Sequence, residues 1–177
     1  PRRRELLAGL DIDYRVTALP EVDESYPDTL SGEEIPLYIS QEKAAAYRRF
    51  MKDNTLLITA DTIVWLDGKV YGKPRDIADA KAMLQALSGK THTVITGVTL
   101  TSLQKQISFA VSTEVTFAAL GDDEIDYYVE TYRPLDKAGA YGVQEWIGYI
   151  GVTGLKGSYY NVMGLPIQRL YTELKKF

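Results

Sequence analysis

The sequence predicts an α/β fold in which a mixed sheet is flanked by helices. Helical and strand-like segments alternate along all 177 residues, and no low-complexity linker or repeat interrupts them. The hydrophobic fraction of 45% is enough for a substantial core. The Asp67-Gly68 pair is typical of a tight β-hairpin, which indicates that the sheet is not purely parallel. We therefore expect one domain over residues 1–177.

The predicted helices rest on composition and on residues that favour helix ends. Proline suits the first turn, so Pro1 predicts a helix that continues to Leu10. Asp76 is placed to cap another helix, which the Ser88-Gly89 pair ends. Alanine and straight-chain residues favour a helix in the segment IPLYISQEKAAAYRRFM. The five predicted helices cover 1–10, 35–51, 77–87, 122–131 and 164–177.

The predicted strands are short apolar or alternating runs bounded by turn residues. The run TLLITA at 55–60 is continuously apolar, as expected of a buried strand. The stretch TIVWLDGKVYG then turns back at Asp67-Gly68 and forms a hairpin. Further strands are predicted over 15–19, 93–101 and 107–117.

Composition excludes several classes of protein. No apolar run approaches the ~18 residues that a membrane span needs, and no secretory signal is recognisable. Without cysteine there are no disulfides and no thiolate metal sites. A formal net charge of −4 argues against broad nucleic-acid binding, which needs a basic face. We expect a cytoplasmic protein that binds neither membranes nor nucleic acids.

Asp61 and Lys73 are candidates for a catalytic role. Asp61 follows a buried strand directly, at a point where a sheet delivers side chains into a crevice that suits a divalent cation. Thr62 extends the strand with a hydroxyl group. Lys73 lies in a Gly-Lys-Pro-Arg turn beyond the hairpin, which presents its ammonium group from a stiff backbone. The alternative, which an isolated pair fits better, is a turn-closing aspartate and a solvated lysine.

A second pair of candidates lies earlier in the chain. The loop EVDES at 21–25 contains Glu24 among its three carboxylates, and carboxylates are magnesium ligands. Lys43 is followed by three alanines, whose small size lets a helix pack closely and leaves the lysine to reach a pocket. Taken locally, a soluble loop and an ordinary surface lysine fit these residues better.

The stretch LDKAGAYGVQ at 135–144 is less easily explained as structure. Its alternating alanine and glycine allow a backbone to approach a ligand closely. Gln144 offers a two-point hydrogen bond to the edge of a nucleobase. A tight packing bend explains the same residues, and the two readings stay open. His92, the only histidine, has no nucleophile partner at a suggestive spacing and is interpreted as structural.

Charged residues elsewhere suit a polyphosphate and a metal ion. Arg2 and Arg3 lie at a predicted helix N-terminus, where backbone N–H groups favour anions. Common nucleotide motifs are missing, since the chain contains neither a P-loop nor a Gly-x-Gly-x-x-Gly turn after a strand.

These stretches, in this order, resemble the Maf family of nucleoside triphosphate pyrophosphatases. PRRRELL is similar to the second half of the family's S-x-S-P-R-R-x-E-L-L signature. The other matching stretches are EVDE, EKA, ADTIV, GKPRD, LSGKTHTVITGV, DKAGAYGVQ and GSYYNVMGLP. The resemblance covers nearly the whole chain, from Pro1 to about Leu170.

The resemblance implies a fold and a reaction. The fold is that of the inosine triphosphate pyrophosphatases, with an elongated mixed sheet and two lobes around a central cleft. The reaction converts a nucleoside triphosphate and water into a monophosphate and pyrophosphate. DKAGAYGVQ resembles the branch that acts on dTTP, UTP and modified pyrimidine nucleotides.

The resemblance also implies roles for individual residues. Glu24 and Asp61 match carboxylates that hold Mg²⁺ or Mn²⁺, and whether Asp23 or Glu24 is the matching residue depends on the loop before them. Thr62, Gln144 and also Arg3 match positions tied to base selection. The residues matching catalytic or phosphate-binding positions are Arg2, Arg3, Glu24, Lys43, Asp61 and Lys73.

Two further expectations follow from the resemblance. The strand and serine that precede this point in the family are not in the sequence, so we expect it to open within its own phosphate-binding loop. A homodimer is the family-level expectation for assembly. The competing hypothesis is a nucleotide-binding regulatory protein without turnover, in line with the family's association with septum formation.

Overall fold

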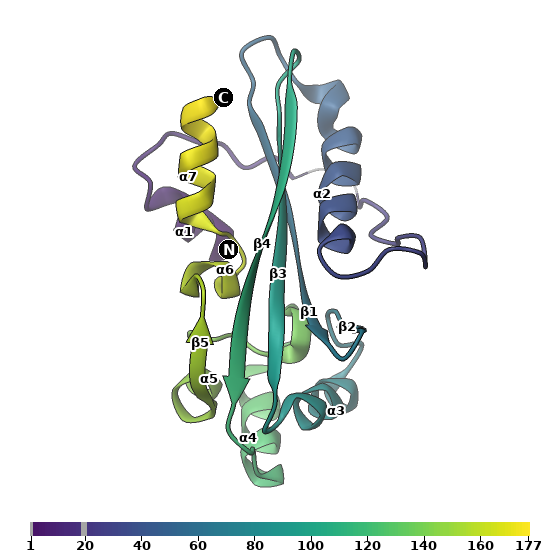
Figure 1. Cartoon of the computed structure of the whole chain (residues 1–177), viewed down its shortest axis with the longest axis vertical. Coiled ribbons are helices and arrows are strands. Elements are labelled where there is room, and N and C mark those ends of the chain that lie inside the picture. Colours follow the sequence, from purple (N-terminus) through teal and green to yellow (C-terminus); the bar gives the residue numbers. More distant parts are fainter. Residues whose placement is uncertain (1, 19–20) are drawn as a thin grey trace. The chain divides into compact units, whose positions relative to one another are not determined.

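A computed structural model describes residues 2–18 and 21–177, and it confirms the predicted α/β class (Figure 1). Five strands are hydrogen-bonded in the order β2-β1-β3-β4-β5. They are β1 (Leu57–Leu66), β2 (Lys69–Tyr71), β3 (Thr91–Thr101), β4 (Gln106–Phe117) and β5 (Val152–Lys156). Strand β1 pairs with β2, and β4 with β5, in antiparallel register, and the first of these pairs is the hairpin predicted at Asp67-Gly68.

The helices predicted from the sequence are present, and two short ones were missed. The α-helices are α1 (Arg2–Ala8), α2 (Glu34–Tyr47), α3 (Ile77–Leu87), α4 (Asp122–Tyr132), α5 (Trp146–Gly151), α6 (Tyr159–Met163) and α7 (Ile167–Lys176). Short 3₁₀ turns cover Arg48–Phe50 and Ala138–Ala140. Helices α5 and α6 have six and five residues, too few for a helical period to appear in the sequence.

The local signals that predicted β1–β2 and α3 act as expected. Asp67 and Gly68 both have positive φ, 51° and 77°, as a two-residue hairpin turn requires. The turn closes the register at Leu66 and Lys69. The Asp76 carboxylate accepts a hydrogen bond of 2.8 Å from the backbone N–H of Asp79 and caps α3.

Two predicted segments differ from the structure. Residues 15–18 of the predicted strand 15–19 lie in no strand, because they join no ladder among the described residues, and Leu19 lies outside the described part. Pro1, the predicted helix start, also lies outside it. The helix predicted over 35–51 ends as an α-helix at Tyr47 and tightens into the 3₁₀ turn.

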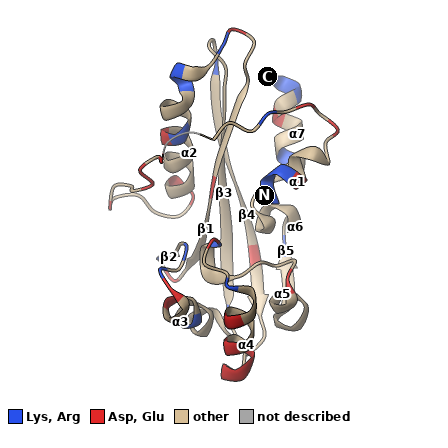
Figure 2. Ribbon diagram, turned by 180° about the vertical axis from the view of Figure 1, so that it is seen from behind, with Lys and Arg blue, Asp and Glu red and all other residues tan. Residues whose placement is uncertain are grey.

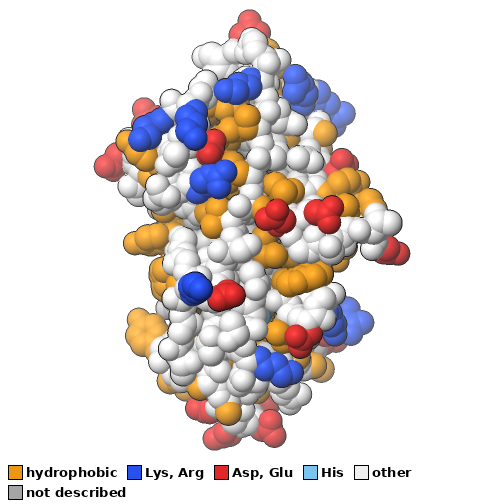
Figure 3. All heavy atoms as spheres, viewed as in Figure 1, with side chains coloured by type: hydrophobic (Ala, Val, Ile, Leu, Met, Phe, Trp, Pro, Cys, Tyr) orange, Lys and Arg blue, Asp and Glu red, His pale blue; other side chains and the backbone are white. Residues whose placement is uncertain are grey.

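The chain divides into two compact units, and the expectation of one domain over 1–177 stays a prediction. The first unit contains residues 1–62, 95–111 and 164–177. It includes α1, α2 and α7 with parts of β1, β3 and β4. Its core includes Leu6, Ile35, Ile39, Val98 and Leu170, all buried. Helix α7 ends in Lys175 and Lys176, which complement the negative end of the helix. Lys and Arg side chains gather on the face of the first unit over α7 (Figure 3).

The second unit contains residues 63–94 and 112–163. Its apolar core joins α3 and α4 to the strands through Leu84, Leu87, Val115, Ile125 and Tyr128, which are fully buried. Helix α4 begins with three acidic residues, Asp122 to Glu124, which complement its positive end (Figure 2).

No helix in the described ranges is both long and apolar enough to cross a membrane.

Candidate active site

Lys43 is the centre of a charged cluster in the first unit. Its Nζ lies 3.1 Å from Oε1 of Glu24 and 3.5 Å from Oδ1 of Asp61. It also donates a 3.0 Å hydrogen bond to the Ala60 carbonyl. The lysine and Asp61 side chains are only 17% and 13% exposed, so their attraction is weakly screened by solvent. The cluster therefore joins α2, β1 and the loop that contains Glu24.

Close packing of α2 against the sheet directs Lys43 inward. Gly97 of β3 faces the backbone of Pro36 and Leu37, and a Cβ atom there would overlap it. The Thr59 hydroxyl of β1 donates a 2.7 Å hydrogen bond to the Ser40 carbonyl. Ala44, next to the lysine, is fully buried. This packing supports the expectation that small residues leave Lys43 as the long side chain reaching inward.

The loop before α2 separates Glu24 from Asp23. The Asp23 carboxylate is exposed and accepts a 2.9 Å hydrogen bond from the backbone N–H of Ser25. That bond from Ser25 lowers the pKa of Asp23. Glu24 is the residue that reaches Lys43. The geometry thus favours Glu24 over Asp23 as the carboxylate of this cluster.

Burial and charge act in opposite directions on Asp61. Desolvation raises the pKa of its carboxyl group above the ordinary value, and nearby Glu24 raises it further. The charges of Lys43 and Arg3 oppose this rise but do not cancel it. Asp61 is thus a carboxylate with a raised proton affinity, held beside two cations.

Arg3 connects α1 with the strand that contains Asp61. Its Nε donates a 2.8 Å hydrogen bond to the Gly164 carbonyl, and its Nη2 donates one of 3.0 Å to the Thr62 hydroxyl. Thr62 also shares a 2.9 Å hydroxyl contact with Thr96 of β3. Burial lowers the pKa of Arg3 and Asp61 raises it. The structure therefore joins two residues, Arg3 and Thr62, that the sequence only assigned to related roles.

A divalent metal fits the chemistry of this cluster. Glu24 and Asp61 present two carboxylates to a single cation, the Lys43 ammonium group. Mg²⁺ is usually held by one or two carboxylates, with substrate phosphates and water as its other ligands. Glu24 and Asp61 would supply a partial ligand set of this kind.

Comparison with known proteins gives these residues a family. The profile of the family described as "Maf-like protein" matches residues 1–177. The chain belongs to the Maf family.

Several curated relatives are similar along nearly their full lengths. A protein of Phocaeicola vulgatus is 67% identical over 176 residues, which are 99% of this chain and 91% of the relative. A Parabacteroides distasonis protein is 58% identical, covering 100% of this chain and 92% of the relative. One from Flavobacterium psychrophilum is 48% identical over 98% of this chain and 89% of the relative. Each of the three is named dTTP/UTP pyrophosphatase.

Three further Maf motif residues have side-chain polar groups without a partner in the described part of the chain. The Arg2 side chain is half-buried and makes no hydrogen bond or ion pair with another described residue. Lys73, in the second unit, is exposed and likewise has no ion-pair partner among residues 2–18 and 21–177. Gln144, also in the second unit, has a buried Oε1 that accepts no hydrogen bond from the described part of the chain. Such an unsatisfied acceptor is uncommon in a folded protein.

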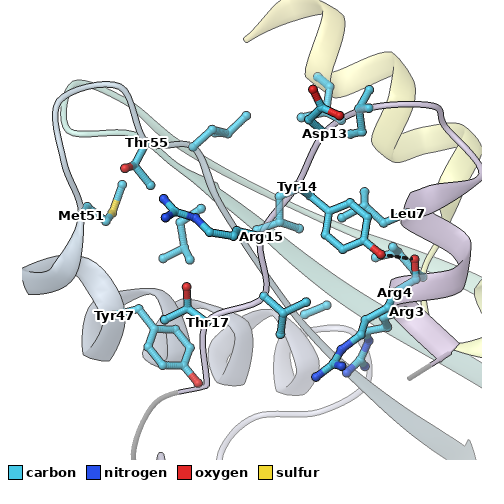
Figure 4. A pocket seen from close by; sticks show the side chains of 18 of the residues that line it. Arg3, Arg4, Leu7, Asp13, Tyr14, Arg15, Thr17, Tyr47, Met51 and Thr55 are labelled. Carbon is cyan, nitrogen blue, oxygen red and sulfur yellow. Dashed lines mark hydrogen bonds between the residues drawn. The ribbon is translucent and has the colours of Figure 1, made fainter.

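The first unit also contains a pocket of about 840 Å³ (Figure 4). Its lining includes Leu7, Tyr14, Arg15 and Met51, and the Tyr14 hydroxyl donates a 3.1 Å hydrogen bond to the Arg4 carbonyl. Arg3 is the only predicted site residue that lines it. The proposed chemistry therefore rests on the Lys43 cluster rather than on this pocket.

Sequence reasoning missed the groups that orient the predicted side chains. The Ala60 and Gly164 carbonyls hold Lys43 and Arg3, and a backbone carbonyl leaves no signal in residue identity. Thr96, which contacts Thr62, lies within the predicted strand 93–101. The recurrence of threonine along that strand, at Thr93, Thr96, Thr99 and Thr101, was the available signal.

Proposed function

We propose that this Maf-family protein is a nucleoside triphosphate pyrophosphatase that acts on dTTP and UTP, including modified pyrimidine nucleotides. Water attacks the α-phosphorus and the bond between that phosphorus and the bridging oxygen breaks. The products are the nucleoside monophosphate and pyrophosphate. The names of the relatives support the substrates. The single observation that carries the chemistry is Lys43 held between Glu24 and Asp61.

Glu24 and Asp61 are the residues that would hold Mg²⁺ or Mn²⁺. When bound, such an ion neutralises phosphate charge and lowers the pKa of a coordinated water. Asp61, the more buried of the two carboxylates, orients the attacking water and accepts its proton.

Cationic side chains stabilise the negative charge of the substrate and the leaving pyrophosphate. In the first unit, Lys43 and Arg3 are held by carbonyl and hydroxyl groups, so their positions are set before substrate binds. Arg2 and Lys73 have the same assigned role, and neither has an ion-pair partner in the described ranges to compete with a phosphate. Groups organised in advance in this way lose little energy to rearrangement during the reaction.

Gln144 is proposed to read the base, together with Thr62 and Arg3. Its buried Oε1 lacks a hydrogen-bond donor among the described residues. The N3–H group of uracil or thymine is such a donor, and the neighbouring base carbonyls accept from the amide nitrogen. A buried acceptor left unpaired is costly, so a base with the matching edge is favoured.

The proposal includes the setting in which the protein acts. Its substrates are present in the cytoplasm, where we expect the protein to reside, and a homodimer is expected from the family resemblance. Light scattering of the purified protein measures the mass, and a monomer at working concentration contradicts the dimer.

The test is pyrophosphate release from a panel of nucleoside triphosphates with Mg²⁺ or Mn²⁺. We expect dTTP and UTP to exceed purine nucleotides in kcat/KM, and chelation by EDTA to stop turnover. A chelated sample that regains activity on addition of metal is the control for denaturation. Tight binding of nucleotides without release of pyrophosphate would contradict the proposed enzymatic activity and support the alternative of a regulatory nucleotide-binding protein.

A further inference from the structure

Gln144 lies in a four-residue turn of the second unit. The backbone N–H of Glu145 donates a 3.0 Å hydrogen bond to the Gly142 carbonyl, which closes a turn over residues 142–145. Gln144 is the third residue of this turn. The position of its amide group therefore depends on how the two ends of the turn, Gly142 and Glu145, are held.

A single hydroxyl group from α4 binds both ends of the turn. The Tyr128 hydroxyl accepts a 3.0 Å hydrogen bond from the backbone N–H of Gly142. The same hydroxyl donates a 2.6 Å hydrogen bond to Oε1 of Glu145. Tyr128 is fully buried, and its bond to Gly142 is shielded from water. We infer that Tyr128 is a positioning residue for base selection, acting through the turn that presents Gln144.

The surroundings of the turn support this assignment over ordinary core packing. Lys137, whose side chain is 12% exposed, lies 3.8 Å from the same Glu145 oxygen. A Cβ atom on Gly142 would lie 2.7 Å from that oxygen, so the glycine leaves the Glu145 carboxylate room to approach the turn. Both ends of the turn, Gly142 and Glu145, are thus bound by polar groups. The Gln144 Oε1 atom between them has no hydrogen-bond partner among the described residues.

The inference rests on the proposed function, in which Gln144 reads the pyrimidine edge. If it is right, losing the Tyr128 hydroxyl frees both ends of the turn without removing Gln144 itself. The amide group then spends less time in the orientation that matches the base. Pyrimidine turnover falls while purine turnover, which does not use this match, changes little.

The test compares Tyr128→Phe with the unmodified protein on dTTP and dGTP. We expect kcat/KM for dTTP to fall about tenfold, mainly through a higher KM. This is the effect of losing one hydrogen bond between Gln144 and the base. The value for dGTP should stay within about twofold, so that the pyrimidine-to-purine ratio falls. Tyr132→Phe is the matched control, because Tyr132 stacks on Tyr128 at 5.2 Å from the same helix and is 38% exposed.

Glu145 provides a second, independent pair of variants if Tyr128→Phe folds poorly. Glu145→Ala removes the acceptor and should lower the ratio as Tyr128→Phe does. Glu145→Gln keeps an acceptor for the tyrosine hydroxyl and should restore most of the ratio. Equal losses for dTTP and dGTP, or an unchanged ratio in Tyr128→Phe and Glu145→Ala, would overturn the inference and leave the proposed function standing. An unmodified protein that releases no pyrophosphate overturns both.

Discussion

At the residue scale, the charged and polar side chains of this protein act in small groups. The Lys43 ammonium group is fixed in position because it forms ion pairs with Glu24 and Asp61 and donates a hydrogen bond to the Ala60 carbonyl. The Arg3 guanidinium group is fixed in the same way by its hydrogen bonds to the Gly164 carbonyl and the Thr62 hydroxyl. In each case the neighbours decide the position and the charge of the group. Residue type by itself would have left both cations as ordinary surface side chains.

His92 shows the same dependence for a structural residue. It is 1% exposed, and its Nε2 lies 2.6 Å from the Tyr141 hydroxyl. Its ring meets Phe117 and Tyr141 edge to face, with centroids 5.0 and 5.4 Å away. Burial lowers the pKa of His92 from 6.5 to about 4, so the folded protein keeps it neutral. The expectation that this histidine is structural fits these contacts.

The lowered pKa of His92 predicts a pH dependence of stability. Between pH 6.5 and 4 the unfolded chain binds a proton at this residue and the folded protein does not, so stability falls as pH falls through this window. Relative to His92→Gln, the unmodified protein should lose ~2 kcal/mol of unfolding free energy between pH 7 and pH 5. Urea unfolding at both pH values measures this. Parallel pH profiles for the two proteins would show that His92 is not responsible.

At the element scale, the site depends on how closely α2 approaches the sheet. Gly97 of β3 leaves room for the backbone of Pro36 and Leu37, and Thr59 and Ser40 lock the contact with a hydrogen bond. Lys43 lies about one helical turn beyond Ser40 in α2. The close approach of α2 to the sheet therefore also determines where the Lys43 ammonium group lies. The helix is thus a positioning element as well as part of the core.

Gly97→Ala tests this role of α2. The added methyl group overlaps the helix backbone, which has no flexible end to move away, so α2 must shift. We expect a loss of ~1–3 kcal/mol in unfolding free energy, typical of overpacking, together with reduced pyrophosphatase activity. Gly72→Ala is the control, since a Cβ atom there meets nothing within 4 Å. Thermal unfolding of both variants measures the difference. Equal stability of Gly97→Ala and Gly72→Ala would contradict the close contact between Gly97 and α2.

At the scale of the whole molecule, the sequence predicted what local chemistry determines. The α/β class, the hairpin at Asp67-Gly68 and the cap at Asp76 each follow from a few adjacent residues. The antiparallel β4–β5 pair was missed because its partners are distant in sequence. Residues 15–18 of the strand predicted over 15–19 lie in no strand, because an extended segment becomes a strand only beside a partner.

For the candidate site too, the sequence predicted individual residues but not the contacts between residues that are distant in the chain. Motifs pointed to the residues for which we propose a chemical role, including Lys43, Asp61 and Gln144. They did not indicate that Lys43 joins two carboxylates or that Tyr128 binds both ends of the turn around Gln144. These relations join residues far apart in the chain, and tertiary packing creates them.

The acidic balance of the molecule also fits the proposed substrate class. A net charge of −4 gives no broad attraction for polyanions, so nucleic acid is expected to bind weakly. The charges of Lys43 and Arg3 are screened by salt beyond about 10 Å, so in the proposed function they would act on a triphosphate only at short range.

Pyrophosphate release by Asp61→Asn tests the central claim most directly. The substitution keeps the size of the side chain and removes the charge that faces Lys43. In the proposed mechanism this carboxylate accepts the proton of water. With dTTP and Mg²⁺, the account predicts a folded variant whose kcat falls ~100-fold or more below that of the unmodified protein. Near-normal turnover by a folded Asp61→Asn protein would contradict the account.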